Sequence, residues 1–503
     1  MVRIPHREVL KVESLTISRR TFVGGGAALP VALPAALPMM AAVAQQAPAT
    51  KAAVVPNILL VICDQMRGDA LGSLGNPNAR TPNLNRMARQ GVTFDNCFSN
   101  NPVCVPSRKS LFSGLYPHEH GTLTNQNHKF LGISDESMIA HFKKKGYRIG
   151  YFGKNHTFTP EAVAKFDKTG IRDREPFREY NSWSTPYWYS ANYWPPEKCH
   201  PHLNTEDAID FLRTQPKGER FFMTVSYFDP HPPYFAPAEY LLRRDPNSIR
   251  IPEYISPDAI TPRLGEFSRA LGLESVGEAD MKQAMHHYHA AVEWGVDQQV
   301  GRLLDTLERQ NLTKDTVVVF VSDHGDFGGH NNMLGKAMFL HDSLLHVPMI
   351  WYAPGRVAQG VRRSSMAQLI DVFPTLLELT GGTVASNLSG RSLKGDLQGG
   401  DDPAPDRPIY TSAAYGRIDF DKLPEGAEDT PLHTRVLNFA MNPKHRTSMV
   451  RTKEWKMVLN EEGPPELYHM NGGHVERANV SGRKEYADVR RGLEKNLSQW
   501  WKW

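Results

Sequence analysis

The sequence predicts an α/β fold with a large, mixed and mainly parallel sheet, followed by a small antiparallel α+β domain. Along most of the chain, short apolar, β-branched runs alternate with stretches whose apolar residues recur every three or four positions. This alternation is typical of strands separated by helices. After about residue 385 it gives way to a segment rich in Pro, Gly and Asp, and then to short strand-like pieces. At 503 residues the chain is long enough to bury a large core.

Four apolar runs are expected to be strands of the large sheet, and each ends in residues that carry chemistry. In chain order the runs are 54–62, 147–152, 221–228 and 316–321, and they are followed by Asp64 and Gln65, Lys154 and His156, His231, and Asp323 and His324. Open α/β sheets bind ligands outside the carboxyl ends of their strands. Any one of these polar groups is explained by a helix cap or a solvated loop, but four such strand ends together predict one site.

Helices are expected between these strands, and a smaller domain after them. The helical pattern covers residues 83–90, 137–145, 296–310 and 372–379. Strand-like pieces at 448–451 and 455–459 lie in the C-terminal part. We therefore predict a catalytic domain over residues 45–385 and a C-terminal subdomain over residues 386–503.

Residues 1–44 are expected to be an export signal of the twin-arginine type. Adjacent Arg19 and Arg20 precede a weakly apolar stretch that ends at a small-x-small cleavage site, residues 42–44. The alternative is a membrane anchor, but three prolines interrupt the stretch and no unbroken apolar span of about 20 residues exists. The mature protein is predicted to begin near Gln45, without a stable membrane anchor, and to be periplasmic or secreted.

Charge and cysteine content exclude several classes of protein. The formal net charge is +4, and the first 44 residues hold five Lys and Arg against two Asp and Glu. The rest is nearly neutral and has no basic tract for nucleic acid. Four cysteines in so long a chain do not make a disulfide scaffold, and collagen, coiled coil and polytopic membrane protein do not fit the composition.

The most specific segment is Cys104-Val-Pro-Ser-Arg108, followed six residues later by Gly114. It resembles the signature of the type I, formylglycine-dependent sulfatases. Other segments match the family's pattern in order and spacing, namely Thr81-Pro82-Asn83, Gly153-Lys154-x-His156, Pro230-His231, Asp323-His324-Gly325, Gly335-Lys336 and Glu466-Leu467-Tyr468. The resemblance spans residues 56 to 470 and implies an alkaline-phosphatase-like sandwich. A lone buried structural thiol would not bring these other motifs with it.

The resemblance also implies how the site works. Cys104 would be oxidised by a formylglycine-generating enzyme to an aldehyde, whose hydrate has one hydroxyl to attack sulfur and a second to expel sulfate. Asp323 would take the first proton and His156 the second. One of His231 and Lys336 would act as general acid toward the leaving alcohol.

A divalent cation is implied beside the nucleophile. Its ligands would be Asp64, Gln65, Asp323 and His324, together with the modified Cys104. The oxygen-rich set suits Ca²⁺ best, and Mg²⁺ or Mn²⁺ are alternatives. Lys154 would offset the charge of the sulfate, and Arg108 would hold the hydrated aldehyde and the metal side in place.

Two departures from the family pattern leave an alternative open. Many sulfatases have Asp where this chain has Gln65, and Asn where it has His324. Both variants resemble choline sulfatases and phosphonate monoester hydrolases, which share the formylglycine nucleophile. The predicted activity is therefore hydrolysis of a sulfate monoester of a sugar, glycan or small alcohol. The alternatives are a phosphonate monoester or phosphodiester hydrolase and, from another class, a non-catalytic binder of sulfated glycans with an unmodified Cys104 thiol.

Substrate contacts are only hypotheses at this level. Trp183, Trp188, Tyr189 and Trp194 form an aromatic-rich loop that either stacks on sugar rings or caps the core. His433 and Arg435 are candidates for contacts to an anionic sugar. Three further cysteines, Cys63, Cys97 and Cys199, allow at most one disulfide bond, and their spacing does not say which.

Overall fold

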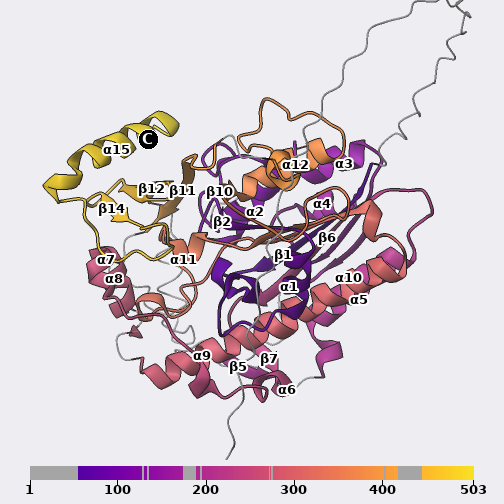
Figure 1. Ribbon diagram of the computed structural model, residues 1–503, viewed down its shortest axis with the longest axis horizontal. Coiled ribbons are helices and arrows are strands. Elements are labelled where there is room, and N and C mark those ends of the chain that lie inside the picture. The colour runs from indigo at the N-terminus through magenta and orange to yellow at the C-terminus, as the bar shows by residue number, and fades with distance from the viewer. Residues whose placement is uncertain are drawn as a thin grey trace, which may run out of the picture. The chain divides into compact units, whose positions relative to one another are not determined.

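The large sheet has eight strands, and it is mixed but mainly parallel (Figure 1). The computed structural model describes residues 55–126, 130–132, 135–173, 189–192, 195–270, 272–273, 276–400, 404–416 and 444–502. The strands are β1 (Asn57–Asp64), β2 (Val92–Phe98), β3 (Arg148–Gly153), β4 (Lys168–Ile171), β6 (Phe221–Pro230), β8 (Thr316–Ser322), β9 (Met349–Tyr352) and β10 (Val361–Gln368). Their order is β10-β2-β9-β8-β1-β6-β3-β4, and only β9 runs antiparallel to its neighbours. The predicted sheet is confirmed.

The four runs predicted from sequence are four adjacent strands, β8-β1-β6-β3. They are parallel, with Ile58 of β1 opposite Val317 of β8 and Phe222 of β6. Their carboxyl ends consequently lie at one edge of the sheet, as expected for an α/β ligand site.

Two layers of helices cover the sheet because β1 presents alternate apolar residues to its two faces. Leu59 and Val61 pack against α1 (Pro82–Arg89), α5 (His200–Arg213), α9 (Glu278–Ala291) and α10 (Gln299–Arg309). Leu60 and Ile62 pack against α2 (Cys104–Ser113), α3 (Met138–Lys144) and α12 (Val372–Leu379). Figure 1 shows the first group below the sheet and the second above it.

Three of the four predicted helices are confirmed as α1, α3 and α12. The fourth differs at its start, since residues Val292–Gln298 are π-helical and join α9 to α10. Besides several short 3-10 helices, the structure describes α4 (Pro160–Val163), α6 (Ala238–Leu241), α7 (Pro257–Ile260), α8 (Pro262–Ala270), α11 (Asp342–Leu345), α13 (Lys394–Leu397) and the strand pair β5 (Tyr189–Asn192) and β7 (Tyr234–Pro237).

The C-terminal part forms a second, antiparallel sheet, β11-β12-β13-β14, with α15 (Ala487–Trp500) packed on it. Its strands are β11 (Ile409–Tyr415), β12 (His445–Arg451), β13 (Trp455–Asn460) and β14 (Glu466–His469). Buried charges join it to α11, because Asp342 accepts from Lys456 at 2.7 Å and from Arg451 at 3.2 Å. The predicted antiparallel α+β character is confirmed, while the boundary at residue 385 stays a prediction.

Several sequence predictions fall outside the described residues. These are the signal at 1–44, the aromatic residues Trp183, Trp188 and Trp194, and the pair His433 and Arg435. Of the helices that the structure describes, none is both long and apolar enough to cross a membrane.

Candidate active site

Cys104 is the first residue of α2, and the helix directs its amino end at the sheet edge where the strands finish. Every residue of α2 is buried, and Val103 before it is extended. The amino end of a helix favours negative charge. The helix stops at Gly114, whose backbone adopts a φ of 71° while its N–H bonds the Ser110 carbonyl oxygen at 2.8 Å. The cysteine and the glycine of the motif therefore mark the two ends of one buried helix.

The end of β3 explains the glycine that precedes Lys154. Gly153 has a φ of 96°, and a Cβ there would lie 2.0 Å from the carbonyl oxygen of Ser226 on β6. Only glycine allows this close approach of the two strands. The chain then turns so that the buried Lys154 Nζ contacts the Asp64 carboxylate.

Charged and polar side chains surround the sulfur of Cys104. Lys336 Nζ lies 2.9 Å from Sγ, His324 Nε2 3.3 Å, and Lys154 Nζ and Asp64 Oδ1 each 3.6 Å. Burial and the Asp64 carboxylate raise the pKa of the thiol, but the two lysines lower it more. The net result is a Cys104 pKa well below its usual range. The site thus favours an anion at the position of this side chain.

Arg108 sits one turn further along α2 and links both carboxylates of the cluster. Its Nε donates to Asp323 Oδ2 at 2.6 Å, and its NH2 to Asp64 Oδ2 at 3.3 Å. A third bond goes from its NH1 to Ser226 Oγ at 2.8 Å. The side chain is completely buried, so these bonds fix the helix to the ends of β1, β6 and β8.

Asp64, Cys104, Asp323 and His324 form a group able to hold a metal ion. Each offers one ligand atom, and these atoms lie within 4.8 Å of one another. Burial raises the pKa of Asp64, but Lys154 and then Lys336 bring it well below its ordinary value, so this carboxylate is charged. Carboxylate oxygens with one imidazole fit a divalent cation.

Gln65 adds a neutral oxygen beside this group. Its backbone has a φ of 71°, and its N–H donates to Asp323 Oδ1 at 3.1 Å. Its Nε2 donates to Asp326 Oδ2 at 2.6 Å, whereas its buried Oε1 has no hydrogen-bond partner among the described residues. An orphaned amide oxygen next to two carboxylates fits the predicted role of a metal ligand.

Asp326 is a residue that the sequence prediction missed. Besides Gln65 it accepts from Tyr234 OH at 2.8 Å and from the backbone N–H groups of Gly328 and Gly335, at 2.8 and 2.9 Å. It therefore fixes the orientation of the Gln65 amide and the loop that leads to Lys336. The available signal was its position three residues after Asp323, in the same strand-end segment.

Two of the three histidines predicted for the site, His156 and His231, interact with the cluster and are neutral. Burial, and next Lys154, lower the pKa of His156, although a hydrogen bond with Cys104 opposes this. Burial, and next Lys336, bring the pKa of His231 well below its usual range. The Nδ1 of His231 lies 2.7 Å from the Pro232 carbonyl oxygen. A carbonyl only accepts, so Nδ1 carries the proton and Nε2 of the neutral ring is an acceptor.

Asp323 and Lys336 complete the charge distribution. Burial raises the pKa of Asp323 more than Arg108 lowers it. Burial lowers the pKa of Lys336, but the charges of Cys104 and Asp64 raise it above its ordinary value, so Lys336 is a cation. All the residues predicted for the site are thus in or next to one cluster.

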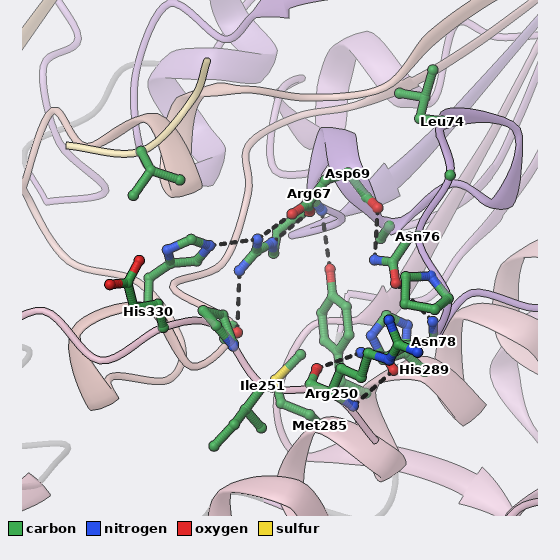
Figure 2. A pocket seen from close by; sticks show the side chains of 18 of the residues that line it. Arg67, Asp69, Leu74, Asn76, Asn78, Arg250, Ile251, Met285, His289 and His330 are labelled. Atoms are coloured by element: carbon green, nitrogen blue, oxygen red, sulfur yellow. Dashed lines mark hydrogen bonds and ion pairs between the residues drawn. The ribbon is translucent and has the colours of Figure 1, made fainter. Parts of the chain in front are cut away.

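A pocket of about 440 Å³ lies beside the segment that follows Gln65, and none of the predicted site residues lines it. Figure 2 shows Arg67 at its wall, bonded to Asp69 and to His330. The backbone N–H of Arg67 donates to Tyr288 OH at 3.0 Å. These bonds fix the chain just beyond Gln65. The residues that line this pocket therefore support the segment next to the cluster, and the pocket itself is not the predicted site.

The other cysteines are buried free thiols, Cys63, Cys97 and Cys199. No disulfide bond forms among them.

The fold and the cluster define a hydrolase of the alkaline-phosphatase-like class. Residues 56–382 match the sulfatase family model, which is more than half of the chain. The chain belongs to the sulfatase family, and it is a sulfuric ester hydrolase.

Curated relatives agree over most of the chain. The ulvan-active sulfatase of Formosa agariphila is 28% identical over 88% of this chain and 80% of that protein. An arylsulfatase of Clostridium perfringens is 27% identical over 67% of this chain and 78% of its own.

Solved structures share the fold. The phosphonate monoester hydrolase of Agrobacterium radiobacter superposes with a TM-score of 0.71 at 22% identity, over 88% of this chain and 94% of that one. A protein solved with its substrate D-glucosamine-2-N,6-O-disulfate gives a TM-score of 0.69 at 22% identity, over 88% and 97%. At this identity the likeness concerns the fold.

Proposed function

We propose that this sulfatase hydrolyses a sulfate monoester of a saccharide through a formylglycine made from Cys104. One observation carries the proposal: the Cys104 side chain starts a buried helix between Lys154 and Lys336, where an anion is favoured. The modified residue would supply an aldehyde hydrate, one hydroxyl to attack sulfur and one to release sulfate. Two lysines on either side are suited to hold the sulfate oxygens against the amino end of α2.

Asp64, Gln65, Asp323 and His324 are proposed to bind one divalent cation, with Ca²⁺ favoured by the oxygen donors and Mg²⁺ or Mn²⁺ as alternatives. The cation would neutralise the sulfate and lower the pKa of the attacking hydroxyl. Arg108 supports this set from behind, because its guanidinium neutralises both carboxylates while binding them in fixed positions.

The protonation states of the remaining side chains suggest which of them accepts and which donates each proton. Asp323, with its raised pKa, suits the first proton acceptor, and neutral His156 suits the base that releases sulfate. Lys336 suits the general acid better than His231. Lys336 is a cation 2.9 Å from the Cys104 sulfur, whereas the neutral His231 has its only proton on the nitrogen that faces Pro232. His231 then accepts a hydrogen bond and orients the leaving group.

A phosphonate monoester or phosphodiester hydrolase is the second candidate. Gln65 and His324 favour it, since both variants resemble those of phosphonate monoester hydrolases. Gln65 also removes one negative charge from the site, and His324 adds a nitrogen ligand. Two phosphonate monoester hydrolases also share the fold, with TM-scores of 0.71 and 0.72. The sulfatase names of the curated relatives favour the first candidate. A pure glycan binder is disfavoured because it needs neither His156 nor Lys336.

Maturation and location belong to the same proposal. A formylglycine-generating enzyme would act on the segment around Cys104 before folding, since the whole of α2 is buried in the folded chain. Twin-arginine export of the folded protein to the periplasm or the medium would follow. The substrate would be a sulfated glycan, the chemistry that the names of several relatives indicate.

The experiment compares kcat/KM of the purified, matured protein on an aryl sulfate, an aryl phosphonate monoester and an aryl phosphodiester. Cys104→Ala is the blank, and Cys199→Ala is the matched control that loses a buried thiol elsewhere. The proposal predicts the highest value for the sulfate. A higher value for either phosphorus ester would overturn it in favour of the second candidate.

A further inference from the structure

Arg263, the second residue of α8, is held between two aromatic rings. Its guanidinium carbon lies 4.3 Å from the centre of the Phe339 ring and 4.0 Å from that of Tyr415. Both distances are within the range of cation–π contacts. Phe339 belongs to the large domain and Tyr415 to β11 of the second sheet. The two rings contact the faces of the guanidinium, and its N–H groups at the edge remain available for hydrogen bonds.

This guanidinium has no acceptor in the described part of the chain. Its Nε is buried without a hydrogen-bond partner, and no hydrogen bond or ion pair joins its other nitrogens to a described residue. Burial lowers the pKa of Arg263, and Glu466 opposes this only from a distance. The Glu466 carboxylate already accepts from Asn460 at 3.0 Å and from Tyr468 at 2.8 Å. Arg263 is half-buried, and its buried Nε without an acceptor is a costly arrangement that an anion would relieve.

Arg263 lines a pocket of about 150 Å³. Its other charged lining residues are Glu266 and Glu462, both on exposed side chains where water screens them. The space suits a single anionic group of a sugar and not a whole oligosaccharide. Arg263 is the one cation among the lining residues.

The wall of the pocket is connected along the chain to the loop that carries Lys336. Met338 and Phe339 line it, two and three residues after Lys336, the proposed general acid. Met338 also packs in one hydrophobic cluster with Val103, which directly precedes Cys104. Met338 thus links the wall of this pocket to the start of the helix that carries Cys104.

We propose that Arg263 binds a second anionic group, a sulfate or a carboxylate, on the alcohol part of the substrate. The inference rests on the proposed function and narrows it to saccharides with at least two negative charges. The planar donors of Arg263 match two coplanar oxygens of either group. Phe339 and Tyr415 hold them ready, so little side-chain entropy is lost on binding.

The test measures binding to the full chain with Cys104→Ser, which stops turnover. Isothermal titration calorimetry compares N-acetyl-D-glucosamine 6-O-sulfate with D-glucosamine-2-N,6-O-disulfate, so that a neutral amide in the first ligand is replaced by one anion in the second. A second comparison tests a carboxylate as the second anion. It uses two 6-sulfated disaccharides, one with a uronic acid and one without. Each is titrated into this parent, into Arg263→Met, which keeps an apolar stem between the rings, and into Arg269→Met. Arg269 is the matched control, an arginine of the same helix that pairs with Asp258 at 2.8 Å on the surface.

The parent should bind at least one dianion about 10-fold more tightly than its monoanion, an advantage that falls with added salt. Arg263→Met should abolish this advantage, and Arg269→Met should keep it. Equal affinities in the parent, failure to bind either dianion, or an advantage that survives Arg263→Met would overturn the inference. A purely structural role would weaken both partners of a pair equally and lower the melting temperature. If the matured wild type released no sulfate, the proposed function would fail, but this binding difference would still be measured separately.

Discussion

Asp326→Asn should damage the site although Asp326 touches neither the sulfur of Cys104 nor any predicted substrate position. One carboxylate oxygen accepts from Gln65 Nε2 and Tyr234 OH, the other from the backbone N–H groups of Gly328 and Gly335. An asparagine has only one acceptor oxygen, and the backbone donors cannot turn. Its NH2 group must therefore face Gln65, whose amide has to rotate by half a turn. The rotation directs Gln65 Nε2, a donor, to where its orphaned Oε1 lies.

The size of the effect follows from the bonds that change. A hydrogen bond to a charged group contributes about 1.5–3 kcal/mol, and about 1.4 kcal/mol corresponds to a factor of ten. Loss of one such bond, and of one oxygen ligand, should lower kcat/KM on an aryl sulfate by about 10- to 100-fold. The metal concentration that gives half-maximal activity should be higher in Asp326→Asn than in the wild type. Steady-state kinetics at several Ca²⁺ concentrations measure both.

Tyr234→Phe is the matched control. It removes a hydroxyl from the same carboxylate but leaves Gln65 bound, so kcat/KM should fall by less than about fivefold. If kcat/KM of Asp326→Asn stays within threefold of the wild-type value and the metal requirement does not change, the role assigned to the Gln65 oxygen is refuted.

Three further predictions concern stability and the site. Burial opposes the low pKa of Asp342 and of Glu476. Lys456 and then Arg451 nevertheless bring the pKa of Asp342 well below its ordinary value, and His341 and then Lys456 bring that of Glu476 to about 2. Both carboxylates therefore stabilise the fold above the unfolded pKa of about 4, and this is lost as the pH falls further. Urea midpoints should drop between pH 5 and pH 3, with a smaller drop in Glu476→Gln. Gly153→Ala should lower the free energy of unfolding by about 1–3 kcal/mol and remove most of the activity, because the new Cβ meets the carbonyl oxygen of Ser226. Urea unfolding curves and kcat/KM of the variant measure the two effects. Dialysis against a chelator should abolish sulfate release, and added Ca²⁺ should restore it; full activity in the chelated protein would contradict the proposed metal site.

The four strands that the sequence predicted in the large sheet are almost entirely buried. All eight residues of β1 are buried, which is why an unbroken apolar run marks it. By contrast, β10 alternates exposed and half-buried residues over its first half, with Arg362 and Arg363 among them. As an edge strand it needs apolar residues on one face only. The antiparallel β9 has only four residues, too few to distinguish from a loop.

Residues that contact the reacting group were predictable from their motifs, whereas supporting residues were not. Cys104 and Lys336 belong to motifs with specific spacing. Asp326 lies in the same strand-end segment as Asp323, but only the tertiary structure reveals that it accepts a hydrogen bond from Gln65. Arg263 carried no local signal, since Phe339 and Tyr415 come to it from elements far apart in sequence. Neither position could be inferred without knowing which elements meet.

The central claim is that the nucleophile derives from Cys104. Its most direct test is to prepare the protein with graded amounts of formylglycine-generating enzyme. Mass spectrometry of the peptide containing residue 104 then gives the converted fraction, and sulfate release from an aryl sulfate gives the activity of each preparation. The account predicts activity proportional to the converted fraction and extrapolating to zero for the unmodified thiol. Full activity in a preparation whose Cys104 is entirely unconverted would contradict it.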